Sequence, residues 1–422
     1  MKAGYLSRYF EGAAAKRLSA VEVDVLRSNQ HEFNGAEGFK AFLGEPEGRV
    51  RYAAKFLYLN DHDDEPVVDD GFMTWYDARQ RARQKRGIMR WEYRLYFPTN
   101  QVSQIAAAGD LLVIAKRSDD TLLAIVAERG STIEQQLLWL FGFTDLDFAG
   151  FAVKSGLESE RNRVGFAAQT VLEQIGLEIE EDAPNFLEEM LRLFDGGYPK
   201  TREFSAYARR TLRDVDARLD PDAALLAWME HEEILFRTLE RHLLAERLQE
   251  LLRNAEPDLD AFMALALSFQ QRRKSRAGSA LENHLEHVFA DHSVTYTRTG
   301  VTENNLKPDF IFPHIDAYRD SSFPKTRLTM LASKTTCKDR WRQILNEAAR
   351  IQLKHLITLE PSISENQTSE MRREGVQLVV PRALHGTYGQ RQRSWLWGVA
   401  DFVNLVRDRQ RGEGSVHALT TM

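Results

Sequence analysis

The chain of 422 residues contains a single cysteine, Cys337, and no long uninterrupted apolar segment. One thiol cannot form an intrachain disulfide or a multi-cysteine zinc site, so we expect a reducing compartment, the cytoplasm. Charged residues interrupt the first 18 positions, which therefore lack the apolar core of a signal peptide, and no later run is long enough to span a bilayer. We therefore expect no membrane partner.

The sequence also lacks an excess of positive charge. Its 56 Lys and Arg against 62 Asp and Glu give a net charge of -6, which argues against a protein that coats nucleic acid indiscriminately. A site-specific DNA enzyme remains compatible, because it can confine its basic residues to a cleft. The composition, with 43% hydrophobic and 28% charged residues, is that of a soluble globular protein, and the length predicts two or three domains.

The pattern of the chain changes near residue 177. Before it, strand-like runs at residues 51–58 and 110–115 alternate with Gly-rich and Asp-rich turns, which predicts a mainly β domain over residues 1–177. An acidic stretch and a Gly-Gly-Tyr-Pro turn then predict a linker or hinge over residues 178–199 that contains one short helix.

The second half has the pattern of an α/β domain over residues 200–409, followed by a polar, flexible tail at 410–422. Apolar residues at helical spacing predict a long helix over residues 223–254 and a second helix near 279–290. The remaining expected elements are strands at 309–313, 328–332, 356–359 and 376–380, and helices near 341–352 and 394–407.

Four residues of this half form a candidate hydrolytic site: Glu282 on a helix, Asp309 at the opening of a strand, Lys334 at the end of the next strand and Glu347 on the following helix. Asp309 and Glu347 would hold Mg2+, which would neutralise the scissile phosphate and acidify water, while Lys334 would orient that water. Taken alone, Asp309 and Lys334 also fit a solvated turn and a surface lysine. Their placement at strand ends of one sheet, with Glu347 one helix later, favours the hydrolytic site.

A charged triplet, Lys338, Asp339 and Arg340, begins the helix that leads to Glu347. Lys or Arg can bond guanine O6 and N7, and Asp can accept from cytosine N4, so the triplet suits reading adjacent G and C in the major groove. The alternative is a solvated helix start in which Asp339 interacts with the helix dipole.

Longer motifs of the second half resemble the EcoRII-like type II (type IIE) restriction endonucleases. They are RRKSRAG at 272–278, LENHLEH at 281–287, KPDF at 307–310, KTTCKDRWRQILNE at 334–347 and EGVQLVVP at 374–381. The resemblance implies a PD-(D/E)XK restriction-endonuclease-like α/β fold, in the variant that lacks the acidic residue two positions before the lysine. Ala332 occupies that position here.

In this family the missing carboxylate comes from the next helix, which corresponds to Glu347, and an additional glutamate corresponds to Glu282. Asp309 and Lys334 carry over directly. Lys338 to Arg340 match the family segment that reads CC:GG, so the resemblance implies double-stranded DNA with CC and GG around central bases, a CC(W/N)GG-like site. Some relatives extrude those central bases, which requires a stacking platform. Trp228 lies near the corresponding region, but a buried core tryptophan is the favoured interpretation.

The amino-terminal block resembles the amino-terminal domain of the same family, on the motifs KRLS at 16–19, SNQHEFNG at 28–35 and the basic run at 79–91. The resemblance implies a β pseudobarrel that binds a second, effector copy of the site and restrains the nuclease until it does. The candidate DNA contacts are Arg81, Arg83, Lys85, Arg86, Gln30, His31 and Asn34, with Trp75, Tyr76 and Trp91 flanking the basic loop. A solvated charged loop is the alternative.

We therefore expect a homodimeric, magnesium-dependent endonuclease that acts on double-stranded DNA. A non-cleaving sequence-specific DNA-binding regulator and a monomeric repair nickase on the same fold are the alternatives. Retention of Asp309, Lys334 and Glu347 counts against the regulator, and dimerisation on a near-palindromic site would count against the nickase.

Overall fold

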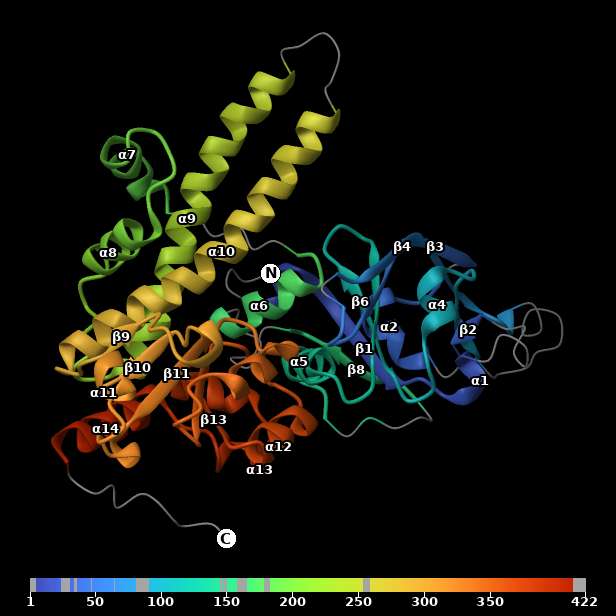
Figure 1. Cartoon of the computed structure of the whole chain (residues 1–422). Helices are drawn as coiled ribbons and strands as arrows, with labels where there is room; N and C mark the ends of the chain where they lie inside the picture. Colours follow the sequence, from blue (N-terminus) through green and yellow to red (C-terminus); the bar gives the residue numbers. More distant parts are fainter. Residues whose placement is uncertain are drawn as a thin grey trace. The chain divides into compact units, whose positions relative to one another are not determined.

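The computed structural model describes residues 5–23, 31–33, 36–46, 48–63, 65–80, 91–144, 146, 150–157, 165–177, 183–252 and 259–412. The chain divides into two compact units: unit 1 contains Met1–Glu178 and Pro361–Gln367, and unit 2 contains Ile179–Glu360 and Thr368–Met422 (Figure 1). In the part of the chain that the structure describes, no helix is long and apolar enough to cross a membrane.

Unit 1 is built on an eight-stranded sheet with the order β2-β5-β4-β3-β7-β6-β1-β8. The strands are β1 (Phe10–Arg17), β2 (Glu32–Phe33), β3 (Arg49–Leu59), β4 (Val67–Asp77), β5 (Tyr93–Tyr96), β6 (Leu111–Arg117), β7 (Leu122–Ala127) and β8 (Ala152–Ser155). Neighbouring strands are antiparallel except β3 and β7, which run parallel. The prediction of a mainly β block is confirmed, and the expected strands at 51–58 and 110–115 correspond to β3 and β6.

Short helices complete unit 1: η1 (Leu6–Arg8), α1 (Ala20–Val23), η2 (Ala36–Phe39), α2 (Lys40–Leu43), α4 (Gln101–Ile105), α5 (Thr132–Phe141) and α6 (Phe166–Gln174). Aromatic side chains join the two edges of the sheet. The ring of Phe151, just before edge strand β8, lies 5.8 Å from Phe33 of the opposite edge strand β2 and 4.7 Å from Phe39. Both edges therefore contribute to one core, and the sheet curls as a pseudobarrel requires.

Residues 361–367 belong to unit 1, although unit 2 surrounds them in sequence. The carbonyl of Pro361 accepts a hydrogen bond from Gln136 Nε2 of α5 at 2.9 Å. Gln367 Nε2 donates to Asp61 Oδ2 at 3.2 Å, in the turn after β3. Hydrogen bonds at both ends thus tie the segment to unit 1.

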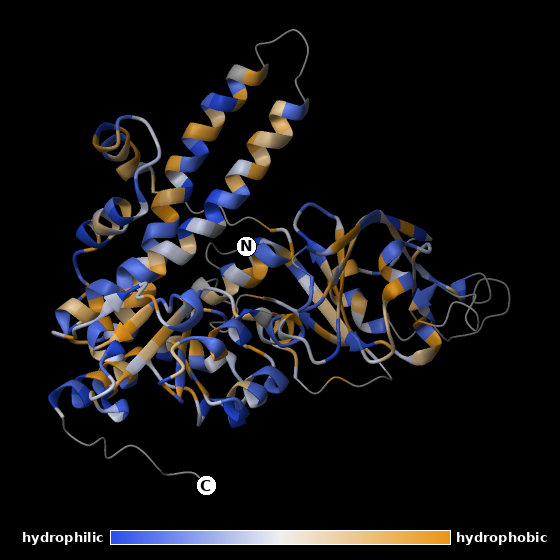
Figure 2. Ribbon diagram, viewed as in Figure 1, coloured by the Kyte–Doolittle hydropathy of each residue, from blue (hydrophilic) through white to orange (hydrophobic). Residues whose placement is uncertain are grey.

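Unit 2 contains a five-stranded sheet with the order β13-β12-β11-β10-β9. Its strands are β9 (Thr297–Arg298), β10 (Phe310–Phe312), β11 (Thr329–Lys334), β12 (Lys354–Thr358) and β13 (Val376–Val379). β9, β10 and β11 are antiparallel neighbours, whereas β11, β12 and β13 run parallel. Almost every residue of β10 to β13 is buried, as the mainly apolar strands of Figure 2 suggest. The α/β expectation and its four strands are confirmed.

The helices of unit 2 are α7 (Pro184–Leu193), α8 (Thr201–Thr211), α9 (Pro221–Leu252), α10 (Leu259–Asp291), α11 (Ile315–Arg319), α12 (Glu365–Arg373), α13 (Gln390–Arg393) and α14 (Val399–Arg411), with 3-10 turns η4 (Glu303–Asn305), η5 (Lys325–Arg327), η6 (Lys338–Asn346) and η7 (Arg382–Thr387). The predicted long helix is α9, and α10 lies beside it (Figure 1). Phe289 of α10 and Phe402 of α14 both pack on Phe312 of β10, so these two helices cover one face of the sheet.

Helix α10 begins twenty residues earlier than the expected helix near 279. Its first turns are rich in apolar residues on several sides, and Phe262, Met263 and Leu267 are exposed, so no single apolar face marked this part as a helix. Helix α7, within the expected linker, buries Met190 against Phe204 of α8 and Phe236 of α9. This part of the segment is therefore packed into unit 2.

The segment after Lys334 differs from the expected helix through residue 352. It is a 3-10 helix that ends at Asn346, because Glu347 is extended and Ala348 has a φ of 48° in the left-handed region. Trp341 and Ile344 are fully buried. Residues three apart share a face of a 3-10 helix, so Glu347 continues the buried side of η6.

Candidate active site

The antiparallel pairing of β10 with β11 brings Asp309 and Lys334 together. Phe310 pairs with Leu331, which puts the residue before β10 beside the end of β11. Asp309 Oδ2 accepts hydrogen bonds from Ser333 N at 2.7 Å and from Lys334 Nζ at 3.1 Å. The Asp309 side chain is 17% exposed and that of Lys334 is 26% exposed. The result is an oriented, partly desolvated ion pair at one edge of the sheet.

Glu347 reaches the same edge from the end of η6. Burial raises the pKa of Glu347, and the neighbouring Asp309 raises this pKa further, while Lys334 and Lys354 act in the opposite direction. Its Oε2 atom is buried and has no hydrogen-bond partner among the described residues. A buried carboxylate oxygen without a donor is costly unless a cation satisfies it.

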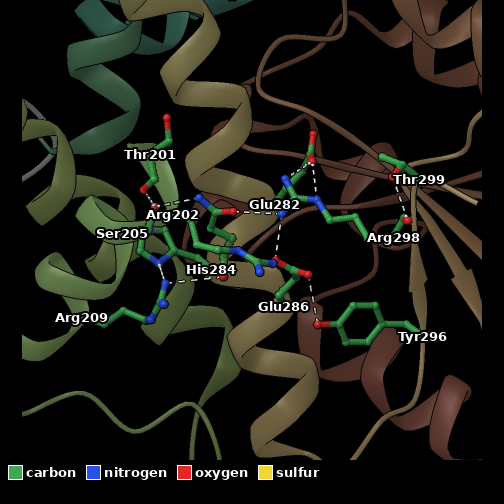
Figure 3. A network of polar contacts seen from close by, with 11 residues as sticks. Thr201, Arg202, Ser205, Arg209, Glu282, His284, Glu286, Tyr296, Arg298 and Thr299 are labelled. Carbon is green, nitrogen blue, oxygen red and sulfur yellow. Dashed lines mark hydrogen bonds and ion pairs between the residues drawn. The ribbon is translucent and has the colours of Figure 1, made fainter. Parts of the chain in front are cut away.

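Glu282 approaches from α10. Burial and the nearby Asp309 raise the pKa of Glu282, and Arg298 opposes this shift. Arg298 Nε and Nη2 donate to Glu282 Oε2 at 3.0 and 2.5 Å, and Arg298 Nη1 donates to Glu286 Oε2 at 2.8 Å (Figure 3). Sequence analysis missed Arg298. The spacing of Glu282 and Glu286 by one helical turn, followed by an arginine at position 298, is the signal that could have pointed to it.

A wider polar network holds α10 in place. Glu286 also contacts Arg202 of α8 and accepts from Tyr296 at 3.3 Å (Figure 3). His284, fully buried on the same helix, lies 2.9 Å from Arg209 of α8 and 2.9 Å from Glu232 of α9. Burial lowers the pKa of His284. The helix that carries Glu282 is thus linked to α8, α9 and β9.

The carboxylates of the candidate site are possible ligands of a metal ion. Within residues 5–412, excluding the gaps given above, no group of three or more His, Cys, Asp or Glu side chains is arranged to hold an ion. Asp309 and Glu347 offer two carboxylates. Mg2+ is typically bound through one or two carboxylates, with water and substrate phosphate completing its shell, so these residues fit that ion.

The candidate DNA-reading residues begin η6. Lys338 and Asp339 form its first turn, but their side chains lie outside the described residues; Arg340 is exposed. The N–H of buried Cys337, directly before them, donates to the Glu360 carboxylate at the end of β12. Glu360 was not predicted from the sequence, and it anchors the start of η6 to the sheet.

In unit 1, the ring of His31 packs against Phe97, and its Nε2 lies 2.9 Å from Thr99 Oγ1. Arg81, Arg83, Lys85, Arg86, Gln30 and Asn34 lie outside the described residues. Of the aromatics expected to flank the basic loop, Trp75 is a core residue that donates to Gly44 O at 3.0 Å, whereas Trp91 is exposed. The sheet buries Trp75, so its side chain cannot contact DNA.

In unit 2, Trp228 is 3% exposed and packs against the rings of His284 and His287. The interpretation of Trp228 as a core residue is confirmed.

An aspartate that opens one strand, a lysine that ends the next and a carboxylate from the following helical segment define a restriction-endonuclease-like, PD-(D/E)XK type of unit. The family model described as "EcoRII C terminal" matches residues 236–403. The type II restriction enzyme EcoRII of Escherichia coli is 35% identical over 399 residues, which cover 92% of each chain. The chain therefore belongs to the EcoRII family of type II restriction enzymes.

Two solved restriction-endonuclease structures are also similar. Metal-depleted Ecl18kI in complex with uncleaved, modified DNA has a TM-score of 0.45 and 19% identity, and the match covers 57% of this chain and 88% of that one. The PspGI–substrate DNA complex has a TM-score of 0.42 and 16% identity, covering 51% of this chain and 94% of that one.

Proposed function

We propose that this chain is a Mg2+-dependent endonuclease that cuts double-stranded DNA at a CC(W/N)GG-like site as a homodimer. The observation that carries the proposal is a buried Glu347 oxygen, beside the Asp309–Lys334 pair, that accepts no hydrogen bond from the part of the chain that the structure describes. Carboxylate oxygens that can hold a hard cation, next to a lysine, are the groups that phosphodiester hydrolysis needs.

Each residue has a separate role in this proposal. Asp309 and Glu347 would hold the cation, which would neutralise the scissile phosphate and acidify water. Lys334 orients the attacking water and stabilises the charge that develops on the phosphate. Ser333 N–H holds Asp309, and Asp309 in turn holds Lys334. Glu282, restrained by Arg298, adds a carboxylate near Asp309.

We assign recognition of the DNA sequence to Lys338, Asp339 and Arg340. They follow Lys334 by four to six residues and precede Glu347 on the same segment. The proposed catalytic and base-reading side chains therefore lie on one stretch of chain. The hydrogen bond from Cys337 N–H to the Glu360 carboxylate supports this assignment, because it orients the start of η6.

The test is digestion of plasmids with and without CCWGG and CCNGG sites, in Mg2+ and in chelator, by wild type, Asp309→Asn and Glu347→Gln. We expect double-strand cutting only with wild type, a site and Mg2+, and sequencing of the cut ends defines the site. Binding without cutting by wild type would favour the regulator, and nicks alone would favour the nickase. Sedimentation of the DNA-bound protein tests the homodimer.

We also propose that unit 1 binds a second, effector copy of the site and thereby releases the nuclease. The basic run at residues 79–90, which follows β4, supports this role, and Arg81, Arg83, Lys85 and Arg86 are its proposed contacts, with Gln30, His31 and Asn34. Coupling of this kind requires that effector DNA binds the active state more tightly than the restrained state. A one-site plasmid should be cut slowly by wild type and faster when short site-bearing duplexes are added. Arg81→Ala/Arg83→Ala should lose the acceleration and keep the slow basal rate.

A further inference from the structure

Lys354, the first residue of β12, is a buried lysine near the candidate active site. It is 5% exposed. Its ammonium donates to the backbone carbonyls of Glu347 and, at 2.8 Å, of Ala348. Lysines are almost never this buried unless their charge is paired or satisfied. Here the ammonium is directed at the backbone that carries Glu347.

The turn at Glu347 needs such support. Ala348 adopts a left-handed φ of 48°, which is unfavourable for a residue with a Cβ atom. Two successive carbonyls accept from one ammonium, so both face the same side of the turn. The bonds from Lys354 offset the cost of this conformation and hold the direction in which the chain leaves η6.

The other side of the turn is held separately. Glu303 Oε2 accepts from Ala349 N at 3.3 Å, and Tyr318 Oη donates to Glu303 at 2.6 Å. Arg350 Nη1 donates to the carbonyl of Asp320 at 2.8 Å. The residues after Glu347 are therefore fastened to η4 and to the end of α11, while Lys354 fastens Glu347 itself to the sheet.

Support matters because Glu347 is not on a strand. The position two residues before Lys334 is Ala332, fully buried in β11, so the strand ladder cannot orient the second carboxylate. A displacement of about 1 Å in a reacting group can cost roughly 100-fold in rate. We propose that Lys354 is a positioning residue that holds the Glu347 carboxylate beside Asp309. This inference rests on the proposed role of Glu347.

The test is Lys354→Met, which keeps an unbranched side chain one atom shorter than that of lysine and removes the charge and the donors. The Mg2+ concentration for half-maximal cleavage should rise about 10- to 100-fold, as is typical when a partner behind a metal ligand is lost. Calorimetric Ca2+ binding to the protein–duplex complex, which requires no cleavage, should weaken by a similar factor. Affinity for the site-bearing duplex in chelator should stay within about twofold, and Lys354→Arg should recover part of the ion affinity.

Arg409→Met is the matched control. Arg409 Nη1 donates to Leu328 O at 3.0 Å and to Thr329 Oγ1 at 2.8 Å, at the end of β11 far from Lys334. Its loss should lower thermal stability without changing the Mg2+ requirement or Ca2+ affinity. If Lys354→Met does not fold, Lys354→Gln, which is shorter and uncharged, takes its place and should shift both ion measurements in the same direction.

Two results are decisive. Wild-type Mg2+ dependence and Ca2+ affinity in folded Lys354→Met, or in Lys354→Gln if that variant is the one that folds, together with an inactive Glu347→Gln, would overturn the role of Lys354 alone. Full cleavage by Glu347→Gln would instead overturn the proposed role of Glu347.

Discussion

At the scale of residues, the candidate site depends on charges that are partly withdrawn from water. Lys334 and Asp309 are each mostly covered and lie 3.1 Å apart. A lower local dielectric strengthens their interaction with each other and the attraction of Lys334 for a phosphate placed beside it. The same surroundings raise the pKa of Glu282 and of Glu347, and burial is the larger cause at both residues.

Lys334→Ala should lower the single-turnover cleavage rate by about 100- to 1000-fold, because it removes a donor aimed at developing charge. Specific binding should persist, since the proposed reading residues are elsewhere on the segment. Single-turnover cleavage and gel-shift binding in Ca2+ measure the two effects. Undiminished cutting would show that Lys334 takes no part in the chemistry.

His355 gives a pH prediction for the core of unit 2. Complete burial, with a smaller contribution from Arg409, lowers the pKa of His355 from 6.5 to about 3. His355 therefore takes up a proton near pH 6.5 in the unfolded chain but stays neutral in the folded chain. Its contribution to the free energy of unfolding is present above that pH and is lost as the pH falls toward 3. Between pH 7 and pH 5 this residue should cost about 2 kcal/mol.

His355→Phe should remove this part of the acid sensitivity, since an aromatic ring would keep the contacts with Trp397 and Phe402. Urea unfolding of both proteins at pH 7 and pH 5 makes the comparison. An equal loss of stability on acidification in the two proteins would assign the sensitivity to other groups.

At the scale of elements, the segment from the end of β11 through η6 combines chemistry with recognition. Its 3-10 form buries Trp341 and Ile344 and leaves Arg340 exposed. Cys337 N–H is bonded to Glu360 at one end, and Glu347 is bonded to Lys354 at the other. The element is thus attached to β12 at one end and to the residues directly after β12 at the other, so its exposed side keeps a defined orientation.

Arg340→Ala should weaken specific binding by about 1 to 3 kcal/mol and relax discrimination at one base pair, as loss of a base-edge contact does. Arg342 is the control, because it is similarly exposed but pairs with Glu370 at 2.8 Å. Binding of duplexes with each base pair of the site substituted in turn makes the measurement. A uniform loss over all sequences would mark Arg340 as a phosphate contact.

At the scale of the whole molecule, each unit has a core of its own, and the core of unit 2 includes α7. Phe33, Phe39 and Trp75 belong to the core of unit 1. Met190 of α7 is fully buried with Phe204 and Phe236 in unit 2. A nuclease fragment must therefore begin before α7.

A fragment of residues 183–422 should cut one-site plasmid at a rate that does not respond to added duplex, whereas the full chain should respond. A fragment that begins at residue 199 should unfold at a lower temperature, because removal of α7 exposes apolar surface. Melting curves and one-site digestions of the three proteins test both statements. Acceleration of the 183–422 fragment by duplex would place the effector response outside unit 1.

The sequence by itself determined the class of each unit and the first part of the site. Continuous apolar runs predicted β10 to β13, and strand-like runs that alternate with turns predicted a β-rich first unit. Both are possible because the burial of a strand determines its local pattern of apolar residues. The same runs placed Asp309 and Lys334 at strand ends.

Tertiary structure alone decided how the remaining groups are held. Periodicity did not distinguish the 3-10 form of η6 from an α-helix, nor did it show that Lys354 holds Glu347, that Arg298 holds Glu282, or that residues 361–367 belong to unit 1. These features depend on contacts between different elements, even where the partners are close in sequence, as Lys354 and Glu347 are. A local pattern reports which side of an element is buried, whereas packing decides which distant side chain meets it.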